Sequence, residues 1–460
     1  MKLSAKQKLF YGVGAFGYGA VNQTFGNFLM FFGTCFLGLS GTAMGVVIGI
    51  STVWDAITDP IVGSLSDNYK GKFLDKRRSF MFVGCMAIAI INVFIWSIDP
   101  DWSGSVKFVV MLFALLLVET FNTIYATPYG ALGIDIAKDY NDRTSVQNYK
   151  ITFQFLALIV PSILMAVCLT PKEYVTINTS TRGYIIISAI TSVLCLITGF
   201  MTIFNTKEKK NFEKYYGNTG QIRSYGLVKI LRQRDQLSNP SPLRRVNIKK
   251  MLKDFFEVLR NKNVLSLILG YVFSLSAGAV IASFGMYVFT YTFHFSNFQI
   301  PIIMSSLIVG IIAGQPLWYK ISCHFNKKKT ILIAIITVLV GILLFSLLLI
   351  SKNYFGKYTL VFFVSVIIVI ISCGIGCLHS LPISMFADEV ANTENVAISM
   401  GFLTFSSKIS NAVITFLIGV AIDVSNYNGD IMGIFMVLGV TSFALLALKF
   451  YKKYKENVFN

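Results

Sequence analysis

Two acidic residues, Asp55 and Asp59, lie four positions apart inside an otherwise apolar segment that runs from Gly45 to Leu65. Residues at this spacing share one face of a helix, so the two carboxylates are expected to lie side by side. If the helix crosses a membrane, each carboxylate near its centre costs about 2.5–3.5 kcal/mol by insertion scales. An acidic pair in such a place therefore indicates a functional site.

Three interpretations of this pair are open. Carboxylate oxygens suit hard cations, so Asp55 and Asp59 are candidate metal ligands. Like charges this close could instead share a proton, because each raises the pKa of the other. The third interpretation is an ion pair with basic residues that serves packing alone, although the segment itself supplies no base. A span that begins near Ala43 places Asp55 roughly 18 Å along the helix, close to mid-membrane.

The composition indicates that there is a membrane. The chain has 460 residues, of which 55% are hydrophobic and 13% charged, with a mean hydropathy of +0.66. An ordinary soluble domain is about 25% charged, so these values predict an all-α polytopic membrane protein. The 7 cysteines are scattered through apolar segments without a CxxC pair, and they are expected to be small buried side chains.

The formal net charge of +18 does not indicate nucleic acid, because of where the charge lies. Between residues 205 and 262 there are 15 Lys and Arg against 5 Asp and Glu, a net of +10 that supplies more than half of the excess. Basic loops beside apolar spans are what the positive-inside rule expects.

Twelve apolar spans of about 20 residues or more can be placed along the chain. Every basic cluster then falls on one side of the membrane, which predicts cytoplasmic termini. We expect an N-terminal six-helix bundle (1–204), a basic cytoplasmic linker (205–262) and a C-terminal six-helix bundle with a cytoplasmic tail (263–460). The predicted spans are 10–33, 43–66, 79–98, 106–134, 146–170, 183–204, 264–292, 298–321, 330–350, 357–385, 397–422 and 431–450.

Further polar residues lie deep in these spans. Glu119, Asn122, Thr123 and Ala126 follow the spacing of one helix face. An acidic residue in a span is a functional candidate, but Glu119 could also be a protonated carboxyl that hydrogen-bonds between helices. Asn22 in the first span has the same two interpretations, lining a cavity or contacting a neighbouring helix.

One basic residue, Lys408, lies deep in the eleventh span, with Thr404 one turn before it. A lone buried lysine tends to lose its proton. Next to the carboxylates it would stay charged, or would compete with a cation for them. The glycines of Gly12-Val13-Gly14-Ala15-Phe16-Gly17 match a dinucleotide fingerprint only superficially, since no strand precedes them, and they predict close helix packing.

Together these residues resemble the glycoside–pentoside–hexuronide:cation symporter family of the major facilitator superfamily. The resemblance is most specific at Trp54-Asp55-Ala56-Ile57-Thr58-Asp59-Pro60, and Tyr11 to Gly17, Pro128 to Leu132 and Thr404 to Lys408 support it. It implies a fold of twelve transmembrane helices in two six-helix bundles. It also implies that the carboxylates of the second span bind the coupling ion, Na⁺, Li⁺ or H⁺.

The resemblance assigns roles by position. Asp55 and Asp59 take the cation site, with Thr58 where an asparagine is common. Thr404 and Lys408 match in type and spacing a threonine and a lysine that flank this site. Sugar-binding members carry aspartates where this chain has Gly19 and Ala126, and a basic residue close to Lys150. Glu119 is our candidate to compensate for these missing aspartates. The predicted substrate-contacting residues are Gly19, Asn22, Glu119, Asn122, Thr123, Ala126 and Lys150.

The sequence thus predicts cation-coupled symport of a sugar, glycoside or related small organic solute by alternating access. The replaced aspartates keep open a carrier or exporter of a non-sugar, lipid-like or other solute. An enzyme is disfavoured because His294, His324 and His379 form no catalytic set; a receptor would bind solute without flux. We expect a monomer in the cell membrane whose partners are the solute, a monovalent cation and the bilayer, with no nucleic acid and no cofactor beyond the coupling ion.

Overall fold

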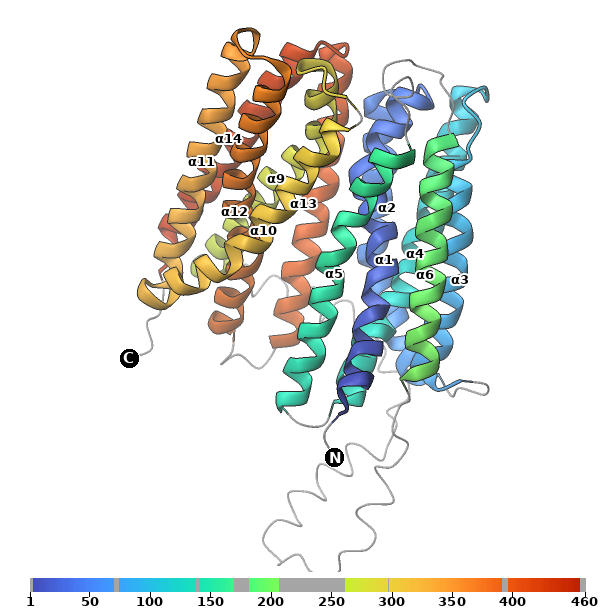
Figure 1. Cartoon of the computed structure of the whole chain (residues 1–460). Coiled ribbons are helices and arrows are strands. Elements are labelled where there is room, and N and C mark those ends of the chain that lie inside the picture. The colour runs from blue at the N-terminus through green and yellow to red at the C-terminus, as the bar shows by residue number, and fades with distance from the viewer. Residues whose placement is uncertain are drawn as a thin grey trace, which may run out of the picture.

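The protein was analysed as a computed structural model of the whole chain (Figure 1). Most of the predicted linker, residues 207–260, lies outside the part that the structure describes. The described residues are 3–69, 74–137, 140–168, 182–206, 261–296, 298–390 and 396–455.

Six long helices form the N-terminal half of the described chain. They run side by side on the right in Figure 1, coloured blue to green. Their bounds are α1 Ala5–Phe31, α2 Gly41–Asn68, α3 Lys76–Trp96, α4 Gly104–Ile136, α5 Tyr140–Cys168 and α6 Arg182–Asn205.

Six further helices form the C-terminal half, on the left in Figure 1. The first helix of each half ends in a five-residue π-helical turn, Phe32–Phe36 after α1 and Val288–Thr292 after α9, as expected for a carrier built from two repeats. The bounds of these helices are α9 Lys262–Tyr287, α10 Gln299–His324, α11 Lys327–Ser351, α12 Lys357–Val390, α13 Val396–Ser425 and α14 Gly429–Lys453.

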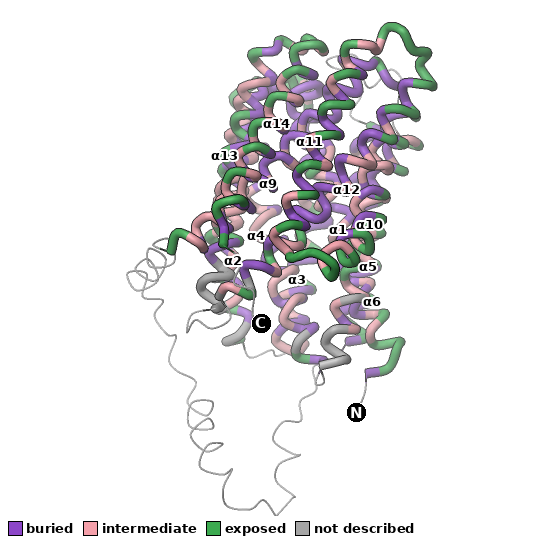
Figure 2. The backbone as a smooth tube through the Cα atoms, turned by 90° about the vertical axis from the view of Figure 1, so that its left-hand side faces the viewer, coloured by how far each residue is buried: buried purple, intermediate pink, exposed green. Residues whose placement is uncertain are grey.

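The twelve helices confirm the predicted fold, an all-α membrane protein of two six-helix bundles. Eleven of the described helices are long and apolar enough to span a membrane. The remaining one, α1, has 27 residues but carries Asn22, Gln23 and Asn27 in its second half. Large apolar side chains such as Ile350 (79% exposed) face outward, while buried residues line the interior (Figure 2). An exposed apolar surface of this kind suits lipid.

The glycines of α1 pack against α5 and α6 of the same bundle. An added Cβ would lie 3.0 Å from Tyr149 on α5 if it were placed on Gly12. On Gly17 it would lie 2.5 Å from the Cys195 Cα on α6. The Gly17 N–H also donates to Thr198 Oγ1 over 3.2 Å. The predicted role of these glycines in helix packing is confirmed.

A Gly17→Ala variant is expected to be less stable than the parent protein by about 1–3 kcal/mol, because the new methyl group would meet α6 backbone that cannot move aside. The measurement is the apparent melting temperature of the detergent-solubilised protein. Gly130→Ala is the control, since no atom lies within 4 Å of a Cβ at Gly130. Equal melting temperatures for the two variants would contradict this packing.

The two bundles meet along α2 and α13. Gly41, Gly45 and Gly49 form a stripe on α2 at a spacing of four residues. A Cβ on Gly45 would lie 2.9 Å from the Cα of Phe416 on α13. Small residues at this spacing allow two helix backbones to approach closely. Gly419 is the small residue on the α13 side of this contact, since a Cβ placed on it would lie 2.7 Å from the Gly41 carbonyl carbon.

The carboxylate of Asp423, near the end of α13, caps the first turn of α2 across this interface. Its Oδ1 accepts a hydrogen bond from the Gly41 N–H over 2.6 Å, and its Oδ2 accepts from the Thr42 N–H over 2.7 Å and from Thr42 Oγ1 over 2.5 Å. The first N–H groups of a helix have no partner within the helix and attract negative charge. A side chain of one bundle therefore completes a helix of the other.

Both termini of the chain lie toward the same end of the molecule, which we call the termini end (Figure 1). The Asp423 cap lies at the opposite end, called here the far end. Two more contacts between the bundles lie there: the Thr34 and Tyr287 hydroxyls are 2.6 Å apart, and Cys35 Sγ lies 3.3 Å from the Tyr291 hydroxyl. The two bundles are thus joined at the far end.

Candidate functional site

A cavity of about 560 Å³ lies between the two bundles. The N-terminal half contributes α1, α2 and α4 to its wall, and the C-terminal half contributes α9 and α13. Much of the wall is apolar, with side chains such as Phe25, Leu29 and Val118. The polar groups gather in the part where α2, α4 and α13 approach one another.

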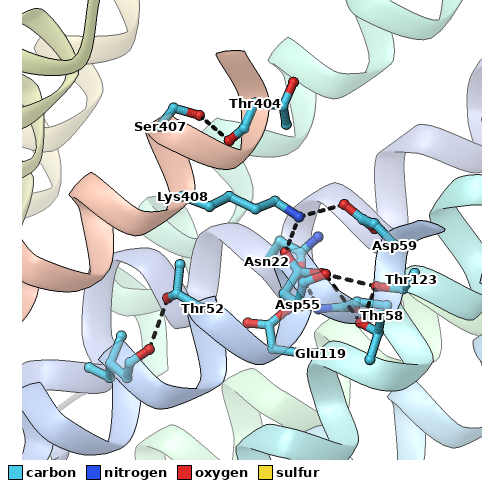
Figure 3. Close-up of polar contacts among 12 residues, drawn as sticks. Asn22, Thr52, Asp55, Thr58, Asp59, Glu119, Thr123, Thr404, Ser407 and Lys408 are labelled. Atoms are coloured by element: carbon cyan, nitrogen blue, oxygen red, sulfur yellow. Dashed lines mark hydrogen bonds and ion pairs between the residues drawn. The ribbon is translucent and has the colours of Figure 1, made fainter. Parts of the chain in front are cut away.

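Asp55, Asp59 and Lys408 form one ion-pair cluster in this cavity (Figure 3). The Lys408 ammonium lies 2.6 Å from Asp55 Oδ2 and 2.5 Å from Asp59 Oδ2. The carboxylates come from α2 and the ammonium from α13, so the cluster joins the two bundles. The structure thus brings together the acidic pair and the one lysine that the sequence singled out in span 11.

The cluster carries a net charge of −1 when all three groups are ionised. Its side chains are partly shielded from solvent, with exposures of 20% for Lys408, 22% for Asp55 and 39% for Asp59. Charges in such surroundings interact much more strongly than in bulk water. One ammonium between two carboxylates leaves one negative charge unbalanced, and this charge would favour the approach of a second cation.

Two threonines complete the oxygen-rich part of the cluster. Thr123 Oγ1 on α4 donates a hydrogen bond to Asp55 Oδ1 over 2.9 Å. Thr58 Oγ1 donates to the Asp55 carbonyl over 3.2 Å and lies 3.5 Å from Thr123 Oγ1. The carboxylate and hydroxyl oxygens of Asp55, Asp59, Thr58 and Thr123 are the donor type that hard cations prefer. The arrangement can hold a small cation if Lys408 moves aside.

A second polar group begins at Asn122, the neighbour of Thr123 on α4, and includes Glu119 one helical turn earlier. Asn122 Nδ2 donates to Asn22 Oδ1 on α1 over 3.0 Å and contacts Glu119 Oε2 at 3.5 Å. Glu119, Asn22 and Asn122 all line the cavity. Ala126 also reaches the cavity wall. These four predicted substrate contacts therefore face the same space.

Thr58, described above, and three further predicted site residues do not line this cavity. Gly19 faces α5, where a Cβ would lie 2.9 Å from the Cβ of Ala157. Lys150 is half-buried, with its ammonium 5.3 Å from the centre of the Tyr129 ring. Thr404 is exposed on α13, and its carbonyl accepts a hydrogen bond from Ser407. The roles of these three residues stay predictions.

Some residues that shape the site were not anticipated from the sequence. Asn411, Thr415 and Ser283 line the cavity from the C-terminal half. The contact glycines of α2 and the Asp423 cap close the far end. The repeated spacing of four at Gly41, Gly45 and Gly49 could have indicated the helix contact. Asp423 lies at the end of a predicted span, where its sequence position does not distinguish it from an aspartate in a solvent-exposed loop. The sequence therefore did not indicate that this residue caps α2.

Three comparisons with known proteins agree on one kind of molecule. A family model described as MFS/sugar transport protein matches residues 10–238 and 224–434. An uncharacterized symporter of Bacillus subtilis, YjmB, is 23% identical over 93% of this chain and 84% of its own length. The sodium-dependent lysophosphatidylcholine symporter 1-A of Danio rerio is 22% identical over 89% of this chain and 76% of its own length.

Solved structures share the fold. A D-xylose-proton symporter superposes with a TM-score of 0.66 at 12% identity, over 98% of each chain. The nucleoside transporter NupG also gives a TM-score of 0.66, at 14% identity, over 98% of this chain and 100% of its own. At these identities the similarity is one of architecture.

Proposed function

Because this chain belongs to the family of MFS/sugar transport proteins, we propose that its acidic pair couples a cation to the movement of a solute. The protein is a secondary transporter, a cation-coupled symporter, and not an enzyme. Its solute is a sugar, a glycoside or a related small organic molecule. The observation that carries the proposal is the cluster of Asp55, Asp59 and Lys408, which is assembled from both bundles.

We propose that the cation and Lys408 compete for the same two carboxylates. A monovalent cation that binds Asp55 and Asp59 would displace the ammonium and so break the bond between α2 and α13. This changes the relative stability of the two conformations of the carrier, one open to each side of the membrane, as alternating access requires. Coupling of this kind is reciprocal, so the solute should tighten cation binding by the factor by which the cation tightens solute binding.

The proposed orientation has both termini in the cytoplasm, since the described basic clusters 76–78 and 327–329 begin α3 and α11 at the termini end. The far end is then extracellular. Contacts between the bundles at the Asp423 cap, at Tyr287 and at Tyr291 close that end. We assign the structure to a state that is closed toward the outside. The domain limits 1–204, 205–262 and 263–460 and a monomeric carrier remain part of this proposal.

Na⁺ is our first choice for the coupling ion. The site offers two carboxylates and hydroxyl oxygens, and the lysophosphatidylcholine symporters related to this chain are described as sodium-dependent. Li⁺ and H⁺ are the alternatives. Thr58 and Thr123 would contribute neutral oxygens, and Thr404 remains a proposed member of the cation site from α13.

Purified protein in liposomes is expected to take up its solute at least about tenfold faster with an inward Na⁺ gradient than in K⁺ medium of equal ionic strength. The measurement is uptake from a panel of radiolabelled glycosides, with Li⁺ and a pH gradient tested in parallel. A solute that binds but never accumulates under any gradient would indicate a receptor and would contradict symport.

A second candidate function is transport of a lipid-like solute. An open apolar groove with a volume of about 400 Å³ lies between α5 and α10, lined by exposed residues such as Ile163, Val167 and Ile302. A smaller cavity shares Ser162 with it and Ala282 with the central cavity. This row of cavities would suit an apolar tail. Uptake of a lysophospholipid but of no glycoside would favour this candidate.

A further inference from the structure

We propose that Ser283 on α9 and Asn411 and Thr415 on α13 form a solute subsite in the C-terminal half, and that this subsite takes an uncharged, hydroxyl-bearing part of the solute. The inference rests on the proposed transport function and deepens it. Every substrate contact predicted from the sequence lies on α1, α4 or α5 of the N-terminal half. The subsite therefore adds specificity from the other bundle.

The position of the subsite follows from Lys408. Asn411 and Thr415 come three and seven residues after Lys408 on α13, so these side chains share one helix face. All three line the central cavity. At 1.5 Å per residue, Asn411 and Thr415 lie roughly 5 and 10 Å beyond Lys408, toward the far end. The subsite thus lies between the ion-pair cluster and the contacts that close the far end.

Helix α9 brings Ser283 to the same level. The hydroxyls of Ser276 on α9 and Ser410 on α13 are 3.1 Å apart, which places these helices side by side. Both helices run from the termini end toward the far end. Ser283 follows Ser276 by seven residues and Thr415 follows Ser410 by five, so both lie roughly 7–11 Å beyond this contact. Ser283 also lines the cavity.

The three side chains have unused hydrogen-bonding capacity. None of them hydrogen-bonds to any residue that the structure describes. In the same cavity, by contrast, the hydroxyls of Ser51 and Thr52 on α2 donate to the Ile48 carbonyl. A polar group that is shielded from bulk water and lacks a partner is costly. A solute that pairs with the buried Thr415 hydroxyl and its neighbours would therefore gain affinity.

The chemistry of these groups favours hydroxyls in the solute. The hydroxyls of Ser283 and Thr415 can each donate and accept, and the amide of Asn411 does both with different atoms. A carboxylate could only accept from them, and an ammonium could only donate. A sugar hydroxyl both donates and accepts, so it can use all three groups fully. The subsite accordingly fits the uncharged face of a glycoside or another polyol.

There is space for a ring in front of the subsite. The α1 and α9 helices meet at Thr34 and Tyr287. Gly26 and Ala279 each lie eight residues before these contacts, and both line the cavity. No atom lies within 4 Å of a Cβ placed on Gly26. These small residues leave room between α1 and α9, and a large side chain at Gly26 would fill it.

The subsite is tested with isosteric and truncating variants of the full chain. The probe is the tightest binder among methyl galactoside, methyl glucoside and methyl xyloside, measured by thermal stabilisation in Na⁺ medium. Thr415→Val and Asn411→Ala should each weaken its binding at least about fivefold, because a solute group then loses its partner. Thr52→Val is the matched control and should change binding less than about twofold, since the Thr52 hydroxyl is used within α2. Equal effects of Thr415→Val and Thr52→Val would overturn the subsite.

A variant that fills the space gives a second test. Gly26→Leu should abolish glycoside binding, while its melting temperature without glycoside stays close to that of the parent, because the added side chain meets no protein atom within 4 Å of its Cβ. Full glycoside affinity in this variant would contradict the placement of the solute.

Failure of the subsite and failure of the transport function can be told apart. Glycoside binding that Thr415→Val weakens, but that no Na⁺, Li⁺ or proton gradient drives into liposomes, would support the subsite and contradict coupled transport. Na⁺-driven uptake that neither Thr415→Val nor Asn411→Ala alters would support transport and overturn the subsite. If no methyl glycoside binds the parent protein, the assignment of a hydroxyl-bearing solute is wrong.

Discussion

Replacing Asp59 with asparagine is expected to abolish stimulation of uptake by the cation gradient. The change removes one negative charge from a cluster whose net charge is −1, so that Lys408 and Asp55 alone would form a neutral pair. A neutral cluster has no surplus charge for a second cation. We expect cation affinity to fall at least about a hundredfold, which corresponds to about 2.8 kcal/mol.

The measurement has two parts, thermal stabilisation by Na⁺ and uptake driven by a Na⁺ gradient. Both should disappear in Asp59→Asn, while solute binding should persist at the weaker affinity that the parent protein shows without Na⁺, because Asp59 lies on α2 and not on the Glu119 turn of α4. Asp135→Asn is a matched control, since Asp135 pairs with Arg77 at 3.2 Å outside the cavity. Normal Na⁺-driven uptake in Asp59→Asn would exclude the acidic pair as the coupling site.

Replacing Asp423 with asparagine is expected to open the far end. The aspartate holds two N–H groups and one hydroxyl of α2, at 2.5–2.7 Å. Hydrogen bonds to charged groups contribute about 1.5–3 kcal/mol each. Loss of the charge should shift the equilibrium between the two carrier states at least about tenfold toward the one that is open at the far end.

Spin labels at Trp102 and Tyr354, both exposed in connections at the far end, would report this change as a longer inter-label distance. Asp430→Asn is the control, because Asp430 pairs with Lys352 at the same end but within one bundle. Equal distance distributions for Asp423→Asn and the parent would show that the cap does not hold the two bundles together.

Much of this architecture could be predicted from local sequence. The predicted span 43–66 corresponds to α2 at Gly41–Asn68, and 183–204 corresponds to α6 at Arg182–Asn205. Apolar length and basic loops carry this information in each segment separately. Helix ends differ more, as for α12, which extends to Val390 beyond the predicted 385.

The acidic pair and Lys408 were identifiable because charged residues inside apolar spans are costly and therefore conspicuous. Local sequence left their mutual contact open, since α2 and α13 are separated by hundreds of residues, and only the family resemblance placed Lys408 beside the acidic pair. The same limit applies to Gly19, which belongs to a predicted sugar-contacting position but packs against Ala157. Which face of a helix looks into a cavity depends on the neighbouring helices, and periodicity alone does not define it.

The sharing of one lysine by two aspartates also determines how the membrane potential acts on the carrier. The cavity that holds no coupling ion is negatively charged, and each bound cation reduces that charge. A membrane potential of 100 mV contributes up to about 2.3 kcal/mol for each elementary charge that crosses the field. An inside-negative potential therefore drives the empty, negatively charged site outward. In the proposed orientation this is the return step of an importer, so voltage would accelerate the half of the cycle in which nothing is carried.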